Sequence, residues 1–256
     1  MSAMRRVQVP MFRYGERDFD ESYLAWGFHD RATQLQEAES VLRIAAPPPP
    51  VRILDLACGI GTHAVRWAAE GHHVTAVDIS ETFIVRARQA AREAGAEVEF
   101  IVEDISRLDY AAAFDLVTWI EHSFFDTDAL ARIRRFLRPG GRFIFDVRNP
   151  AHPKARALSG NWRTWREEDG LFHLERHETE ESGDHVDTWV TIDPTKEVIE
   201  ERVSRTPAAE AKASGFAEKL KQVHAAGFRT VELRTMEGEL FGGGEEPYWL
   251  WAVATK

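Results

Sequence analysis

From Val51 onward, short apolar runs alternate with segments of helical periodicity, and this alternation constrains the fold more than any other feature of the chain. The apolar runs predict strands, and the first three strands with the two helices between them form a βαβαβ series. In chain order these elements cover residues 53–56, 62–70, 74–77, 81–94 and 98–102. Two more strands are expected at 114–119 and 142–147, around a helix that the breaker cluster Pro139-Gly140-Gly141 should end. Parallel strands joined by crossover helices predict a doubly wound α/β sheet.

After Pro150 the sequence changes to alternating polar and apolar residues, rich in Thr, Trp, Val and His. Such alternation predicts antiparallel strands, because residues two apart share one face of a strand. Four strands are expected at 162–166, 171–179, 186–192 and 198–203, with turns of Gly and Asp between them. A helix at about 211–226 and strands at 228–234 and 248–255 then return to the pattern of the core. We therefore interpret residues 149–205 as an inserted antiparallel β cap.

The composition disfavours several classes of protein. A formal charge of −10 at pH 7, with no compensating stripe of Lys and Arg, argues against nucleic acid as a partner. No run of ~18 apolar residues is present to span a membrane, and the N-terminal segment has no apolar stretch typical of a secretory signal, so we expect a cytoplasmic protein. The single cysteine, Cys58, excludes an internal disulfide and a zinc cluster of several thiolates. A small-molecule partner fits this composition best, and a homodimer stays open.

The first βα turn carries small residues, where a ligand can approach the main chain closely. A strand leads through Cys58-Gly59-Ile60-Gly61 into a helix whose first amides are free to bind a ligand. Asp78 closes the second strand about 20 residues further on, where an acidic side chain can accept from both ribose hydroxyls. The third glycine that a dinucleotide pyrophosphate needs is missing, and Asp55 suits an amino-acid ammonium. The turn therefore favours a nucleoside that carries an amino acid.

Five motifs follow one another over about 100 residues. They are Asp55-Leu56-Ala57-Cys58-Gly59-Ile60-Gly61, Val77-Asp78, Glu103-Asp104-Ile105, Phe114-Asp115-Leu116-Val117 and Leu137-Arg138-Pro139-Gly140-Gly141. Together they resemble the ordered motif set of class I S-adenosylmethionine-dependent methyltransferases. The resemblance implies a Rossmann-like doubly wound sheet of about seven strands, the last one antiparallel.

A second resemblance concerns the ends of the fourth and fifth strands. The runs Trp119-Ile120-Glu121-His122-Ser123-Phe124 and Asp146-Val147-Arg148-Asn149 are similar to those of glycine and sarcosine N-methyltransferases. Those enzymes, like sugar-amine and other natural-product N-methyltransferases, also carry an antiparallel insertion after the fifth strand. The glycine enzymes have Gly-Asn where this chain has Glu121-His122, so the identity of the acceptor does not carry over.

The resemblance implies S-adenosylmethionine as the cofactor and S-adenosylhomocysteine as its product. The implied cofactor-binding residues are Arg31, Asp55, Ala57, Gly59, Gly61, Asp78, Ile79, Asp104, Ile105 and Trp119. Asp78 would bind the ribose, and Asp104 would accept from the adenine amino group, with Ile79 and Ile105 against the purine. Asp55 and the glycines would surround the methionine portion. Arg31 would bind the methionine carboxylate, although its place equally fits an arginine on a helix surface.

Four segments follow from these patterns. The tetraproline at 47–50 cannot be helical and separates a polar, helix-prone N-terminal segment from the rest. In chain order we expect a helical segment that covers the cofactor site, the cofactor-binding core, the cap for substrate, and a helix with strands that complete the core. Their bounds are 1–46, 51–148, 149–205 and 206–256.

Methyl transfer from a sulfonium is an in-line displacement, so the protein mainly aligns the acceptor and excludes water. His122 and Glu121 follow the fourth strand, whose carboxyl end faces the crevice, and we predict that they orient or deprotonate the acceptor. Arg148 follows the fifth strand and is expected to bind a substrate carboxylate, unless it forms a structural salt bridge. From the insert, Trp162 and His177 are expected to contact the acceptor, the alternative being that they pack within their own sheet.

The pattern leaves some alternatives open. No metal is expected, because the histidines lack convergent acidic partners at recognisable spacing. A methyltransferase of nucleobase amines would carry Asn/Asp-Pro-Pro-Tyr/Phe after the fourth strand, where this chain has Glu121-His122-Ser123-Phe124. Methyl transfer to N or O of a small molecule is the main hypothesis. A nucleoside-binding or repurposed protein without methyl transfer, and a protein or peptide N-methyltransferase, stay open.

Overall fold

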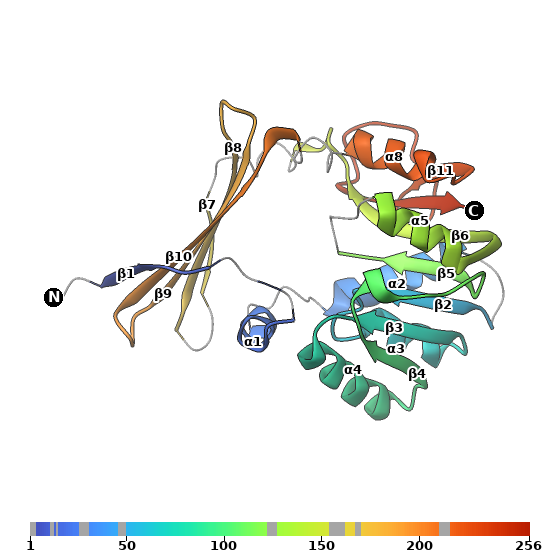
Figure 1. Cartoon of the computed structure of the whole chain (residues 1–256), viewed down its shortest axis with the longest axis horizontal. Coiled ribbons are helices and arrows are strands. Elements are labelled where there is room, and N and C mark those ends of the chain that lie inside the picture. The colour runs from blue at the N-terminus through green and yellow to red at the C-terminus, as the bar shows by residue number, and fades with distance from the viewer. Residues whose placement is uncertain are drawn as a thin grey trace.

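Two β-sheets organise the molecule (Figure 1). The computed structural model describes residues 4–10, 13, 15–25, 31–45, 50–121, 127–153, 162–166, 170–209 and 216–256. Seven strands form the sheet of the core, in the order β11-β12-β6-β5-β2-β3-β4. Five more form a small sheet, in the order β1-β10-β9-β8-β7, which stands apart on the left of Figure 1.

The core sheet is parallel except for one strand. Its strands are β2 (Arg52–Leu56), β3 (His73–Asp78), β4 (Val98–Val102), β5 (Phe114–Trp119), β6 (Leu137–Arg148), β11 (Thr230–Arg234) and β12 (Trp249–Thr255). Strands β2 to β6 pair in parallel, whereas β12 runs antiparallel to both β6 and β11. The Rossmann-like sheet of seven strands with an antiparallel last strand is therefore confirmed.

Helices cover both faces of this sheet. They are α1 (Arg17–Ala25), α2 (Arg31–Ala45), α3 (Thr62–Ala69), α4 (Glu81–Ala94), α5 (Thr127–Phe136) and α8 (Phe216–Ala225), with a 3₁₀ turn η1 (Ile105–Arg107). One buried cluster joins the sheet to α2, α3 and α4, and a second joins its other face to α5 and α8. None of the helices in the described ranges is long and apolar enough to cross a membrane.

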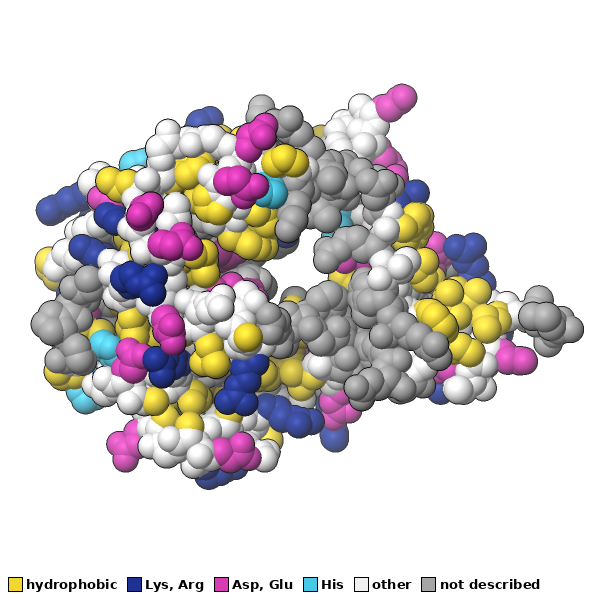
Figure 2. Space-filling model, turned by 180° about the vertical axis from the view of Figure 1, so that it is seen from behind, with side chains coloured by type: hydrophobic (Ala, Val, Ile, Leu, Met, Phe, Trp, Pro, Cys, Tyr) yellow, Lys and Arg dark blue, Asp and Glu magenta, His cyan; other side chains and the backbone are white. Residues whose placement is uncertain are grey.

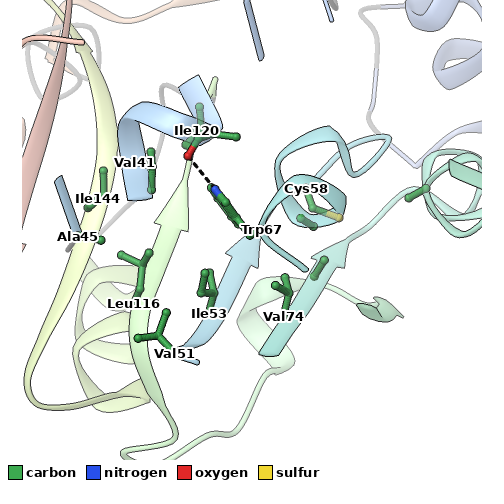
Figure 3. Packing of buried hydrophobic residues seen from close by; sticks show 14 of the residues in the cluster. Val41, Ala45, Val51, Ile53, Cys58, Trp67, Val74, Leu116, Ile120 and Ile144 are labelled. Atoms are coloured by element: carbon green, nitrogen blue, oxygen red, sulfur yellow. Dashed lines mark hydrogen bonds between the residues drawn. The ribbon is translucent and has the colours of Figure 1, made fainter. Parts of the chain in front are cut away.

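Alternation along the strands explains these two layers. Ile53 belongs to the first cluster and its neighbour Leu54 to the second, because successive side chains of a strand point to opposite faces. Figure 3 shows the first cluster, where Trp67 of α3 packs between the sheet and α2 and donates from Nε1 to the Ala38 carbonyl at 2.9 Å. Helix α2 is thus an integral layer of the core.

The small sheet is built from the insert and from one distant segment. Its strands are β1 (Arg5–Gln8), β7 (Trp162–Arg166), β8 (Phe172–Thr179), β9 (His185–Asp193) and β10 (Val198–Thr206). Strands β7 to β10 pair antiparallel, as the alternation predicted. Strand β1 pairs in parallel with β10, with Arg5 opposite Val198. This edge strand lies within a segment that we expected to be helical, so that expectation is wrong for its first residues.

The boundary between α5 and β6 also differs from the prediction. The helix ends at Phe136, and β6 begins at Leu137, so that Pro139-Gly140-Gly141 lies within the strand. Gly140 adopts φ +78°, which distorts the strand, and the register with β5 shifts between Phe114 and Leu116. The breaker residues therefore mark an irregular strand start after the helix.

Candidate active site

A cavity of about 470 Å³ opens where the core strands β2, β3 and β5 end. Its walls come from the turns that follow these strands and β4, which is the crevice where open α/β sheets bind ligands. Lining residues shared with the sequence-predicted site are Ala57, Gly59, Asp78, Ile79, Asp104, Ile105, Trp119 and Glu121. Tyr23, Gln34, His63 and Phe83 add a wall from the helices.

The two glycines of the first turn have different surroundings. Both adopt positive φ, +54° at Gly59 and +76° at Gly61, which L side chains rarely adopt. A Cβ at Gly59 would meet nothing within 4 Å, so this residue leaves open space in the cavity wall. A Cβ at Gly61 would lie 2.8 Å from the Ala87 Cβ, so this residue lets α3 pack against α4. Sequence reasoning had placed both glycines around the methionine.

Asp78 is held in place by main-chain amides. Its two carboxylate oxygens accept from Gly59 N at 2.8 Å and from Ser80 N at 2.9 Å. Burial raises the pKa of Asp78, and the hydrogen bonds from these amides oppose that shift without cancelling it. Each carboxylate oxygen can accept a further hydrogen bond, so the group can still bind a ligand. Asp78 therefore fixes the turn while it faces the cavity.

Two isoleucines and one carboxylate lie around the next part of the cavity. Ile79 is 47% exposed and lines the cavity together with Ile105. The exposed side chain of Ile79, next to the buried carboxylate of Asp78, offers an apolar surface against which a flat ring can pack. Asp104 caps η1, since its Oδ1 accepts from Ser106 N at 2.7 Å, and this bond lowers the pKa of Asp104. The side chain stays ionised and exposed, ready to accept from an amine.

A polar cluster lies beneath the turn, between α2, α3 and the sheet. Asp55 is buried, and its Oδ1 accepts from the Thr118 hydroxyl at 2.8 Å. Its Oδ2 has no hydrogen-bond partner among the described residues. Burial raises the pKa of Asp55 to about 6, against the opposing charge of His63. The side chain of Asp55 lies behind the wall of the cavity and does not line it.

His63 is a cavity residue that sequence reasoning missed. Its Nε2 lies 3.2 Å from Glu37 Oε2 of α2. Burial alone would lower the pKa of His63, but the hydrogen bond to Glu37 and the charge of Asp55 raise it overall. The sequence did hold a clue, because His63 lies in the first turn of the helix that follows Gly61.

The end of β5 forms the wall next to this polar cluster. Glu121 adopts φ +60°, and its amide donates to Asp146 Oδ1 at 2.9 Å. Gln34 of α2 donates to the carboxylate of Glu121 at 3.0 Å. Glu121 is therefore held in place at the cavity wall, which Trp119 also lines. His122, the other predicted catalytic residue, lies outside the described residues.

Besides Asp55 and Gly61, which lie behind the wall, four predicted residues do not line this cavity. Arg31 opens α2 with an exposed side chain. Arg148 lies with its guanidinium carbon 5.5 Å from the centre of the Trp249 ring. Trp162 lies under Arg176 in the small sheet, at 5.1 Å. His177 contacts Glu175 and Asp187 within that same sheet. The cavity is thus assembled from the core and the N-terminal helices, and no described residue of the small sheet lines it.

These features fit one class of ligand. The open space at Gly59 admits a close approach to the main chain, and Asp78 offers acceptors for a diol. Ile79 and Ile105 provide an apolar slot, with Asp104 nearby for an exocyclic amine. Asp55, behind the cavity wall, adds a buried negative charge beneath the turn, which attracts an ammonium bound in the cavity. The residues present therefore fit an adenosine that carries an amino acid.

Comparison with known proteins agrees with this geometry. Residues 53–141 match the family described as "Methyltransferase domain". Residues 53–141 of this chain thus resemble a methyltransferase domain, and the core has the fold of S-adenosylmethionine-dependent methyltransferases. S-adenosylmethionine is the cofactor that the cavity fits. The solved structure of an S-adenosylmethionine-dependent methyltransferase from Clostridium acetobutylicum shares the fold with a TM-score of 0.66 and 17% identity, over 93% of this chain and 97% of that one.

Curated relatives resemble less than half of this chain. Over 121 residues the chain is 38% identical to a malonyl-[acyl-carrier protein] O-methyltransferase of Erwinia pyrifoliae, covering 44% of this chain and 44% of the relative. Over 134 residues it is 34% identical to an S-adenosyl-L-methionine-dependent Diels-Alderase of Talaromyces variabilis, covering 49% and 45%. The matches thus span about half the length of these curated relatives.

Proposed function

We propose that the protein transfers a methyl group from S-adenosylmethionine to a nitrogen or oxygen of a small molecule. The observation that carries this proposal is the cavity at the strand ends of a methyltransferase core, with Asp78 tied to the Gly59 amide at its centre. Bound there, S-adenosylmethionine supplies a sulfonium methyl group open to in-line displacement.

The described residues have distinct tasks in this proposal. Asp78 binds the two ribose hydroxyls, and Asp104 accepts from the adenine amine between Ile79 and Ile105. Asp55, with His63 and Thr118 beside it, attracts the ammonium of the methionine portion. Burial of these groups excludes water from the polar end of the site, which strengthens each electrostatic interaction there.

Glu121 is the described group best placed to orient the acceptor. It faces the cavity, and Gln34 and Asp146 fix its side chain and its main chain. A carboxylate in this position can accept a hydrogen bond from a hydroxyl or a neutral amine and so direct the lone pair toward the methyl carbon. We extend the same role to His122, which follows directly in sequence.

Arg148 is proposed to bind an anionic group of the acceptor, because it ends β6, which pairs with β5, and Glu121 follows the end of β5. We expect Arg148→Lys to raise the KM for an anionic acceptor at least ~10-fold, since an ammonium loses the bidentate geometry. The kcat and the affinity for S-adenosylhomocysteine should stay close to wild type. Arg138→Lys, at the opposite end of the same strand, serves as the control. An unchanged KM would show that Arg148 does not bind the acceptor and only contacts the Trp249 ring.

The decisive experiment combines cofactor binding with an acceptor screen. Purified protein is incubated with S-adenosylmethionine and a panel of small amines, phenols and carboxylic acids, and mass spectrometry follows the gain of one methylene together with release of S-adenosylhomocysteine. Failure to bind S-adenosylmethionine would overturn the proposal.

A repurposed protein would give another result in the same screen. The name of the Diels-Alderase relative includes dependence on S-adenosyl-L-methionine, but the reaction in that name is not methyl transfer. In that case an acceptor would be consumed without formation of S-adenosylhomocysteine. The methylated product is therefore the readout that separates the two functions.

A further inference from the structure

The register of β8 and β9 gathers four polar side chains on one face of the small sheet. His177 lies directly opposite Asp187, and Glu175 and His185 lie two residues along their strands from this pair. Residues two apart share a face, so all four point to the same side. Our sequence prediction that the histidines lack convergent acidic partners at recognisable spacing is wrong here, because Glu175 lies two residues before His177 on β8 and Asp187 faces His177 from β9.

Three of these residues offer ligand atoms close together. One ligand atom from each of His177, His185 and Asp187 lies within 4.8 Å of the others. His177 Nδ1 is 2.5 Å and His185 Nε2 is 3.1 Å from Asp187 Oδ1. Tetrahedral Zn²⁺ with bonds of ~2.0–2.1 Å separates its ligands by about 3.3 Å, so small side-chain shifts would admit the ion.

Glu175 holds the second nitrogen of His177. Its Oε1 lies 2.5 Å from His177 Nε2, and the Glu175 side chain is only 6% exposed. A carboxylate that accepts from one ring nitrogen fixes the tautomer and leaves the other nitrogen to bind a metal. This carboxylate-histidine arrangement is the usual support of a metal-ligating histidine.

The charge of the cluster also suits a dication. Two carboxylates, Glu175 and Asp187, lie against the imidazole of His177, and the charge of a dication balances that of two ionised carboxylates. The cluster is separate from the cofactor cavity, since none of its residues lines that cavity.

We propose that His177, His185 and Asp187 bind one Zn²⁺ ion, with Glu175 as the positioning residue for His177. Two imidazoles and one carboxylate are ligands that Zn²⁺ accepts, and such a set leaves a fourth position for water. The ion would join β8 to β9.

Metal titration of the full chain tests this proposal. After treatment with a chelator, the protein is titrated with Zn²⁺ against a chromophoric competitor, and Co²⁺ is used as a visible probe of coordination. We expect one equivalent per chain and Co²⁺ absorption typical of a tetrahedral site. Asp187→Asn and His185→Gln should each weaken Zn²⁺ binding at least ~100-fold, and Glu175→Gln should weaken it ~10- to 100-fold. His73→Gln, on an exposed position of the core, should leave it unchanged.

Two further measurements keep the test decisive. Circular dichroism shows that each variant retains its β structure, and calorimetry with S-adenosylhomocysteine shows that the cofactor site is intact with and without Zn²⁺. Binding of less than one equivalent, or equal affinity in wild type, Asp187→Asn and His185→Gln, would overturn the metal site and leave an ion-pair cluster. Neither result affects the proposed methyl transfer, because the two readouts are independent.

Discussion

At the scale of single residues, the carboxylate of Asp78 connects the protein's own main chain to its proposed ligand. We expect Asp78→Ala to weaken binding of S-adenosylhomocysteine by about thirtyfold to a thousandfold, since two hydrogen bonds to a charged acceptor are lost. Isothermal calorimetry measures this change. Asp109→Asn, at an exposed acid that does not line the cavity, should bind as wild type does. Unchanged affinity in Asp78→Ala would remove this residue from the site.

Asp55 gives the affinity a predicted dependence on pH. Its pKa of about 6 in the free protein means that the carboxyl is neutral below pH 6, whereas the ionised form attracts an ammonium. The dissociation constant for S-adenosylhomocysteine should therefore rise up to ~10-fold for each pH unit below 6 and level off above it. Two charged groups face Asp55: His63 of α3 lowers the pKa of Asp55, and Asp78 of β3 raises it.

The control for this effect is a ligand without the amino acid. 5′-Methylthioadenosine lacks the ammonium, so its affinity should show no such step near pH 6. Asp55→Asn should likewise abolish the step, which separates Asp55 from Asp146, a carboxyl whose pKa burial also raises to about 6. A step that persists in Asp55→Asn would assign the titration to another group.

At the scale of elements, the two glycines of the β2–α3 turn should separate binding from stability. Gly61→Ala combines positive φ with a clash against Ala87, so we expect a loss of about 2–5 kcal/mol in the free energy of unfolding. Gly59→Ala should lose only about 1–2 kcal/mol but weaken S-adenosylhomocysteine binding at least tenfold, because its methyl group enters the open space. Urea unfolding and calorimetry measure the two effects. If both variants lost similar stability and similar affinity, this separation of roles between the two glycines would be refuted.

The core elements were predictable because each carries its own pattern. Strands β2, β3 and β5 are apolar runs buried on both faces, and their predicted and observed bounds nearly coincide. Strand β1 was not predictable, since its four residues have no alternation of their own and its partner β10 is almost 200 residues away. Its pairing exists only once the insert has folded.

The site was predictable where the strand end itself places the side chain. Asp78 ends β3, Ile79 follows it, and both line the cavity directly. Arg148 was placed from a strand end and His177 from the composition of the insert, but Trp249 and Asp187, which they contact, come from other strands. The sequence shows that such a residue lies on a strand, and it does not show which strand will lie opposite. The metal cluster escaped the sequence reasoning for the same reason.

At the scale of the whole molecule, the two sheets have different sources of stability. Both buried clusters belong to the core, and neither includes a described residue of the small sheet. On the face in Figure 2 the surface is hollowed between the core and the small sheet. Arg6 of β1 pairs with Glu201 of β10, and Arg205 of β10 pairs with Glu180 in the turn after β8. Such surface ion pairs weaken with salt.

We therefore expect hydrogen exchange to distinguish the two sheets. Amides of β8 to β10 should exchange at least ~10-fold faster than those of β2, β5 and β6, because fewer apolar contacts oppose local opening. Added NaCl should accelerate exchange in the small sheet and leave the core almost unchanged. Mass spectrometry of peptides from both sheets provides the measurement. Equal protection of the two sheets at high salt would show that their stability has a common source.

Because β1 pairs with β10, residues 149–205 alone do not contain the whole small sheet. The small sheet is made of two pieces of chain, one before α1 and one between β6 and α8, so the polypeptide passes between the two sheets three times. Cutting out the second piece alone would separate β1 from β10. The unpaired backbone groups of β10 would then be exposed at the edge of the excised sheet. A transplant of this sheet onto another scaffold has to carry both pieces, and a circular permutant has to keep them within reach of one another.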